Sequence, residues 1–226
     1  MKKIFIFLII TIYSTVSFSH MAHYNKFNKI EMEIFRNGEL IGYNYYFFTR
    51  NGDKTTITNQ IKFSVRLLGT TVFHVEGYGE EKYLKDQLIS YNSKTFQNDK
   101  EKFVNLLFDE NKDEFDIKGS SYNGKASNNN IVGNWWNHKI LQVDSQISPI
   151  SGSIKDQVVT FVGKEKIIQY GRTYDVEHFT LKSKDMSLPK NKRLNFDIWD
   201  DKKKSLIIKV SYSRMGNWEY RLKNFN

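Results

Sequence analysis

The sequence predicts an all-β protein, in which a curled antiparallel sheet of roughly 10–12 strands forms a half-barrel or a barrel. Apolar and polar residues alternate with a period of two along most of the chain, as in strands that bury one face. Asn-Gly pairs, which favour hairpin turns, follow the first two alternating segments. The chain contains only two prolines, so strand pairing meets few interruptions. A β-sandwich would fit the same pattern.

The first half of the chain is predicted to form a meander of about seven strands. Ile30, Met32 and Ile34 lie on one face of the first strand, which ends at Asn37-Gly38. Asn and Gly both tolerate a positive φ, so this pair predicts a type I′ turn. The following strands are predicted over residues 39–50, 55–68, 70–83, 87–96, 102–108 and 114–122, with a second turn at Asn51-Gly52.

Residues 123–152 interrupt this pattern. Asn123-Gly124, a polar tract and Pro149 indicate loop structure, so we expect a long loop or short helix around residues 127–150. One helical turn is expected near residues 135–141. A second set of strands is predicted to begin near Val158 and to continue over residues 165–170, 172–183, 193–199, 206–214 and 218–225. A flat open sheet of this size would expose long edges, so the sheet must curl or close.

Residues 1–19 have the features of a secretory signal peptide. Two lysines precede an apolar run, and residues 17–19 form a small-x-small cleavage site before His20. The alternative, a transmembrane anchor, fits less well because the run is short for a hydrocarbon core of about 30 Å. We therefore expect a single all-β domain over residues 20–226, located in the periplasm or secreted.

The composition limits both the partners and the sources of stability. The chain has no cysteine, so the core must stabilise it without disulfides, and 17 Phe, 13 Tyr and 4 Trp provide large side chains for that core. The formal net charge is +9, yet lysines are spread along the chain and alternate with acids, as in Glu80-Glu81-Lys82. This distribution, together with export, argues against nucleic acid as a partner and leaves an anionic envelope component as an alternative. We expect no stable membrane insertion after signal cleavage, and the oligomeric state stays open.

Motifs for catalysis or metal binding are missing from the sequence, so we expect no catalytic residue, no metal site and no cofactor. Of the five histidines only His20 and His23 are closely spaced, and such a pair at a new N-terminus could bind copper or nickel weakly. A buried metal site would have to be assembled from distant strands. The acidic tract 109–113 starts like a calcium loop, but Glu114 and Ser120 stand where Gly and Glu are required. The Gly-x-Ser-x-Gly motif of serine hydrolases does not occur.

The predicted loop contains the first group of candidate ligand-binding residues, Trp135, Trp136 and His138. Two adjacent tryptophans are costly when exposed, so they either close the end of the sheet as a plug or contact a ligand. His138 could then orient a bound polar group.

Strand 39–50 contains the second group, because it carries apolar residues on both faces. Tyr46 lies on one face, and Tyr43, Tyr45 and Phe47 lie on the other. The strand is therefore either covered on both faces or lines a cavity on one side. In the second case Tyr43, Tyr45 and Phe47 are candidate ligand-binding residues.

The two ends of the domain show a family resemblance. The hairpin over residues 35–42, Phe-Arg-Asn-Gly-Glu-Leu-Ile-Gly, resembles the start of exported bacterial domains of unknown function. Residues 195–201, a Trp-containing strand that turns at acidic residues, and residues 206–210 resemble their closing strands. The resemblance covers nearly all of residues 27–226. It implies a periplasmic curled sheet similar to the lipoprotein-localisation carriers, with a concave apolar surface, and it carries over no catalytic residue.

These observations predict a non-enzymatic exported domain that binds an amphipathic or apolar ligand in its concave sheet, with residues 127–150 as a lid or plug. Two alternatives stay open. One is an envelope hydrolase that acts on polysaccharide or lipid with carboxylates or His138. The other is an envelope scaffold whose exposed strand edge pairs with another chain.

Overall fold

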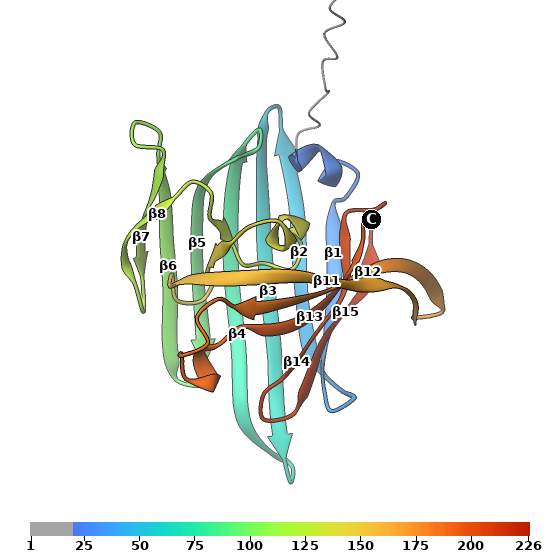
Figure 1. Cartoon of the computed structure of the whole chain (residues 1–226). Coiled ribbons are helices and arrows are strands. Elements are labelled where there is room, and N and C mark those ends of the chain that lie inside the picture. Colours follow the sequence, from blue (N-terminus) through green and yellow to red (C-terminus); the bar gives the residue numbers. More distant parts are fainter. Residues whose placement is uncertain (1–19) are drawn as a thin grey trace, which may run out of the picture.

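The computed structural model describes residues 20–226, and in that range the fold is all-β, with short 3-10 helices beside one sheet of fifteen strands (Figure 1). Residues 1–19, which carry the predicted signal peptide, lie outside the described part of the chain. Across residues 20–226, no helix has the length and apolar character needed to cross a bilayer.

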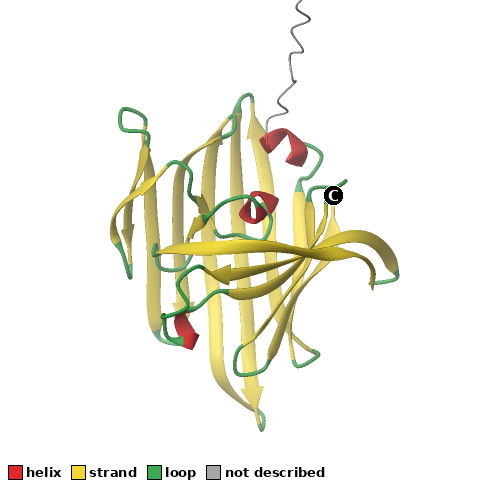
Figure 2. Ribbon diagram, viewed as in Figure 1, coloured by secondary structure: helices red, strands yellow, loops and turns green. Residues whose placement is uncertain are grey.

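The elements, coloured by type in Figure 2, follow in this order: η1 (His20–Tyr24), β1 (Lys29–Arg36), β2 (Glu39–Asn51), β3 (Lys54–Leu67), β4 (Thr70–Leu84), β5 (Gln87–Gln97), β6 (Lys100–Asp109), β7 (Glu114–Gly119), β8 (Asn123–Ser127), β9 (Ile131–Val132), η2 (His138–Leu141), β10 (Ser145–Ile147), β11 (Ile154–Gln169), β12 (Arg172–Ser183), η3 (Lys190–Lys192), β13 (Asn195–Asp201), β14 (Leu206–Ser213) and β15 (Asn217–Phe225).

The strand order explains how the sheet curls without closing. Counted from one edge, the order is β8-β7-β6-β5-β4-β3-β2-β1-β15-β14-β13-β12-β11-β10-β9, so the first and last strands of the domain pair with each other. A meander leads away from this pair on each side, and the edge strands β8 and β9 are not neighbours. In Figure 1, strands β2 to β6 form one wall and strands β11 to β15 cross in front of it. The predicted curled antiparallel sheet is confirmed, in the open half-barrel form.

Three short strands, β8, β9 and β10, lie in the segment that was expected to be loop, which raises the strand number above the predicted range. They extend the two sheet edges: β8 pairs with β7, β10 pairs with β11, and β9 pairs with β10 in parallel. Backbone groups at an edge can pair with any extended segment, so these strands need no alternating side-chain pattern. The expected helical turn is present as η2.

The two Asn-Gly pairs behave differently. Asn37 and Gly38 both have positive φ values, 51° and 84°, as the predicted type I′ turn requires. At the second pair only Gly52 has a positive φ, 58°, because Asn51 still pairs with Lys54 as the end of β2. The second turn therefore lies one residue further along than predicted.

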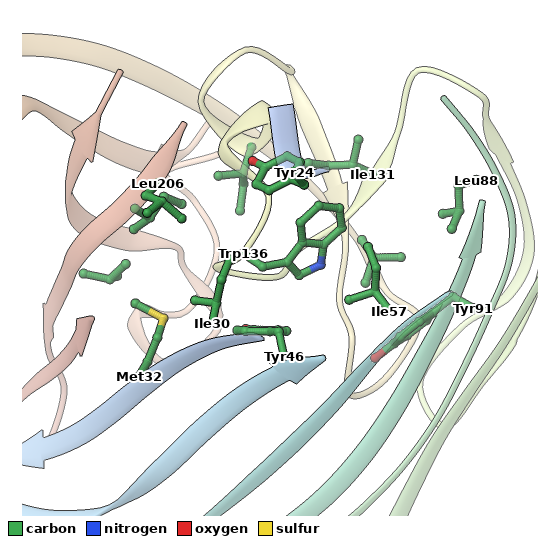
Figure 3. Close-up of a cluster of buried hydrophobic side chains, with 14 of the residues drawn as sticks. Tyr24, Ile30, Met32, Tyr46, Ile57, Leu88, Tyr91, Ile131, Trp136 and Leu206 are labelled. Atoms are coloured by element: carbon green, nitrogen blue, oxygen red, sulfur yellow. The ribbon is translucent and has the colours of Figure 1, made fainter. Parts of the chain in front are cut away.

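The core lies on the concave face of the sheet, where the segment between β9 and β10 folds against the strands. Trp136 is the largest fully buried side chain of the described residues and points into this space between Tyr24 and the strands that carry Tyr46 and Ile57 (Figure 3). Tyr24 belongs to η1, which lies at one end of the sheet (Figure 1). The loop around Trp136 therefore packs into the concave side of the sheet, and we call residues 133–141 the plug.

Candidate ligand-binding groove

A groove of about 880 Å³ lies on the concave face beside Trp135. Its walls come from strands far apart in the sequence: Ile61, Phe63, Val65 and Val75 of β3 and β4, and Phe196, Tyr212, Trp218 and Tyr220 of β13, β14 and β15. The rings of Phe63 and Trp218 meet with their centroids 5.5 Å apart. The curl of the sheet thus joins two apolar faces into one continuous lining.

Gly77 of β4 contributes to the groove by having no side chain. A Cβ at this position would lie 2.9 Å from both Ile61 Cγ2 and Thr95 Oγ1. Both atoms branch directly from a Cβ and have few alternative rotamers, so neither can move aside cheaply. Because Gly77 leaves this space, side chains of β3 and β5 approach each other across β4.

Amide and hydroxyl groups connect the groove to the loop. Asn59 Nδ2 donates to Asn44 Oδ1, and Asn44 Nδ2 donates to Tyr46 Oη at 2.8 Å. Tyr46 Oη in turn accepts a hydrogen bond from the backbone N–H of Trp135 at 3.2 Å. Burial raises the pKa of the Tyr46 phenol, so the hydroxyl is neutral at physiological pH. This chain of hydrogen bonds holds Trp135 at the edge of the groove.

The charged side chains that line the groove are all basic: Arg36, Lys155 and Arg214. Arg36 donates to the backbone oxygen of Met215, and its guanidinium carbon lies 5.9 Å from the ring centre of Trp218. Arg214 is exposed just beyond β14. Among the lining residues, all of which belong to the described chain, neither a carboxylate nor an imidazole occurs. The groove therefore combines apolar walls with positive charge.

Exposed apolar side chains border one end of the groove. Leu67 and Leu68 at the β3–β4 turn are 64% and 99% exposed, and Met215 at the β14–β15 turn is 88% exposed. Val72, at the start of β4, and Met215 also line the groove. Both turns lie at the lower end of the molecule in Figure 1. This end of the groove thus has an apolar rim, which we define as Leu67, Leu68, Val72 and Met215.

A buried carboxylate fixes the plug above the groove. Glu81 of β4 accepts hydrogen bonds from Trp136 Nε1 at 2.8 Å, Asn134 Nδ2 at 2.6 Å and Tyr83 Oη at 2.7 Å. Burial raises the pKa of Glu81, and the three donors act in the opposite direction. On the other side of the loop, Tyr91 Oη donates to the backbone oxygen of Pro149 at 2.9 Å.

A comparison with known protein families identifies the family of the domain. The model of DUF6134, a domain of unknown function, matches residues 32–223. The chain belongs to the DUF6134 family. This finding confirms the resemblance of its first hairpin and closing strands to a domain of unknown function.

The DUF6134 domain also resembles a solved structure of another family. This is the beta-barrel-like protein of the domain of unknown function DUF1849 from Brucella abortus, with a TM-score of 0.58 and 8% sequence identity. The similarity covers 88% of this chain and 95% of that chain. At this identity the likeness concerns the fold. No curated protein matches the sequence.

The structure brings one of the residues predicted in the loop, Trp135, to the groove of the DUF6134 domain. Trp136 is buried in the plug and does not line the groove. His138, the first residue of η2, lies beside His20 and His23 and is also outside the lining. The adjacent tryptophans therefore point in different directions and have different surroundings.

The second predicted group lies on the opposite face of β2, because Asn44, Tyr46 and Phe48 occupy the concave face. Tyr43 and Tyr45 stack with ring centroids 4.4 Å apart. Lys29 Nζ lies 4.7 Å from the ring centre of Tyr45 and 5.1 Å from that of Phe47. Ring stacking and cation–π contacts on the outer surface account for the half-buried state of Tyr43, Tyr45 and Phe47. These residues are not part of the groove.

Sequence reasoning did not find Arg36, Arg214, Phe63 or Trp218 as groove residues. The alternating pattern of β15 does place Trp218 on an apolar face. However, no feature of the sequence indicates that this face meets the face of β3, because that contact depends on the curl of the whole sheet.

Proposed function

We propose that this DUF6134 domain is an exported, non-enzymatic protein that binds an amphipathic ligand with an apolar chain and an anionic head group. The observation that carries the proposal is the groove, whose walls are apolar and whose charged lining residues are all basic. Its volume of about 880 Å³ falls within the range of about 300–1,000 Å³ that is typical of small-molecule sites. The apolar walls hold the chain of the ligand, and Arg36 and Arg214 bind the head group.

The apolar rim supports the proposal that the protein takes this ligand from a membrane. Large apolar side chains that are more than half exposed, such as Leu68 and Met215, suit brief contact with the acyl chains of a bilayer. Arg36 donates to the backbone oxygen of Met215, and Arg214 precedes Met215 in the chain, so both arginines lie at this end and favour an anionic surface. The ligand then passes between bilayer and groove without crossing water as a free monomer. Export is supported by the signal-peptide features of residues 1–19.

The two alternative functions have less support. A hydrolase would need a carboxylate or His138 at the bound substrate, and the described lining contains neither. A scaffold that pairs through a sheet edge would use β11, because the side of this strand that faces away from β12 pairs with β10 only over residues 154–156. The terminal strands β8 and β9 are only 5 and 2 residues long.

A titration with anionic and zwitterionic lysolipids tests the proposal. Oleoyl-lysophosphatidylglycerol should bind with one molecule per chain and change the tryptophan fluorescence, because Trp135 and Trp218 line the groove. Arg214→Glu should weaken this binding about tenfold or more, which corresponds to about 1.4 kcal/mol. Arg172→Glu is the matched control, since Arg172 is exposed on β12 outside the groove.

The proposal fails if the unchanged protein neither binds the lysolipid in native mass spectrometry nor changes its fluorescence. Equal weakening by Arg214→Glu and Arg172→Glu would show that net charge, and not the groove, attracts the lipid. Oleoyl-lysophosphatidylcholine should bind more weakly than the anionic probe and should respond less to Arg214→Glu.

A further inference from the structure

Three histidines from two distant segments meet at the end of the sheet where η1 lies. His20 and His23 belong to η1, and His138 begins η2 more than a hundred positions later. One ring nitrogen of each lies within 4.8 Å of the others. The ring centroids are 5.0 Å apart for His20 and His138, 5.5 Å for His23 and His138, and 5.9 Å for His20 and His23.

Backbone and core contacts hold the two segments together without using the imidazole rings. Tyr24 of η1 is fully buried, and its hydroxyl accepts a hydrogen bond from the backbone N–H of His138 at 2.9 Å. The backbone N–H of Met21 donates to Asp86 Oδ1 at 2.8 Å. The closeness of the three rings is therefore built into the fold.

Neighbouring polar groups orient two of the rings. Asn137 Oδ1 accepts from the backbone N–H of Lys139 at 3.0 Å, which identifies this atom as the oxygen. His20 Nε2, 2.8 Å from the same oxygen, must then carry a proton and donate it, so the lone pair of His20 lies on Nδ1. His23 Nδ1 lies 3.3 Å from Ser205 Oγ. Metal-binding histidines commonly have such a partner on the second ring nitrogen.

We propose that His20, His23 and His138 bind one divalent transition-metal ion, Cu²⁺ or Zn²⁺. Imidazole nitrogens suit these ions, whereas Ca²⁺ and Mg²⁺ require oxygen ligands. At metal–nitrogen distances of about 2.0–2.1 Å, tetrahedral ligands lie about 3.4 Å from one another, so the three rings need only a small movement toward the ion. Three protein ligands leave one position for water. His23 is partly exposed, so an ion can enter from solvent.

The bound ion would connect the N-terminal segment to the plug. η1 and η2 each contribute ligands, and η2 directly follows the loop that carries Trp136. An ion that binds the folded chain and not the unfolded chain raises the free energy of unfolding by RT ln(1 + [ion]/Kd), and the thermal midpoint rises with it. Removal of the ion should therefore loosen the end of the sheet opposite the apolar rim.

The experiment uses protein expressed from the full chain and purified without a polyhistidine tag. After treatment with a chelator, the protein is titrated with Cu²⁺ alone and, separately, with Zn²⁺ alone. The expected result is one ion per chain, with nitrogen hyperfine splitting in the electron paramagnetic resonance spectrum of the Cu²⁺ form. His23→Gln and His138→Gln should each weaken binding at least about a hundredfold, because even the loss of a partner behind a ligand costs 10–100-fold.

His74→Gln is the matched control, because His74 lies on β4 outside the cluster and should leave binding unchanged. Circular dichroism checks that each variant folds. If His138→Gln unfolds, His23→Gln provides the test, since His23 is less buried than His138 and its replacement should disturb packing less. Absence of stoichiometric binding by the unchanged protein would overturn the proposal. Equal affinity in His23→Gln and the unchanged protein would overturn it as well.

Discussion

Trp136 Nε1 donates a hydrogen bond to Glu81 Oε1 at 2.8 Å inside the concave side of the sheet. A tryptophan from the long loop and a carboxylate from the middle of β4 thus meet where both are almost fully removed from solvent. This pairing positions the plug. The part of the concave face that the plug leaves uncovered is the groove.

We predict that replacing Glu81 destabilises the fold, and that the loss is larger when the new side chain has fewer hydrogen-bond acceptors. Glu81→Leu leaves the donors of Trp136, Asn134 and Tyr83 without their acceptor, so the free energy of unfolding should fall by about 2–4 kcal/mol. Glu81→Gln keeps one acceptor oxygen and should cost less. Urea unfolding followed by circular dichroism measures both values. A Leu variant as stable as the Gln variant would contradict a structural role for the carboxylate.

Substitution of the two adjacent tryptophans should have different effects: one should lower stability, and the other should weaken ligand binding. Trp136→Phe removes buried volume and the hydrogen bond to Glu81, so it should lower the free energy of unfolding by about 1–3 kcal/mol. Trp135→Phe, at the groove, should change that free energy by less than about 1 kcal/mol but weaken lysolipid binding. The same urea unfolding and lysolipid titration decide this. Identical effects of the two substitutions would show that the residues act as one unit.

The stability of the domain should depend on pH through Asp200. Burial and the nearby Asp201 and Glu177 raise the pKa of Asp200 to about 7, and among the described residues its Oδ1 has no hydrogen-bond partner. An unfolded Asp releases its proton near pH 4. Between about pH 4 and pH 7 the folded state therefore holds the proton more tightly, so this group's contribution to stability falls as the pH rises.

Asp200→Asn removes this dependence. At pH 8 the variant should be more stable than the unchanged protein, by on the order of 2–4 kcal/mol, and at pH 4 the two should be nearly equal. Urea unfolding at both pH values gives the difference, in which the contributions of all other groups cancel. Asp144→Asn is the control, because Asp144 is exposed. A gain that is the same at pH 4 and pH 8 would refute the titration of Asp200 as its cause.

The apolar rim should matter for ligand uptake from membranes and not for binding from solution. Leu68→Asp should slow the transfer of a fluorescent anionic lysolipid from vesicles to the protein several-fold, since a charge would then oppose contact with acyl chains. Its affinity for the same lipid below the critical micelle concentration should stay unchanged. Ile168→Asp is the matched control, because Ile168 is 77% exposed beside the β11–β12 turn. Equal transfer rates for both variants would show that the apolar rim has no part in the transfer of lipid from vesicles.

The fold could be predicted because its signals are local. The alternation of Ile30, Met32 and Ile34 and the turn at Asn37-Gly38 act over a few residues, and the structure has them as expected. The strand number was underestimated because the short edge strands around residues 123–147 form by backbone pairing alone.

A concave apolar surface was expected, but the residues that form the groove and the histidine cluster could not be predicted, because both depend on contacts across the curl. Tyr43, Tyr45 and Phe47 are as apolar as the groove residues, but the pairing register turns them outward. His138 reaches His20 and His23 because Tyr24 anchors η1 against η2, and no spacing in the sequence reports this contact.

A photo-crosslinking experiment tests most directly whether the concave face is the binding site. An anionic lysolipid with a photoreactive group at the end of its acyl chain is bound, irradiated and mapped by peptide mass spectrometry. We predict labels on groove residues such as Phe73 and Trp218, which competing unlabelled lipid should suppress. Labels confined to the outer face, at Tyr43, Tyr45 and Phe47, would contradict the account.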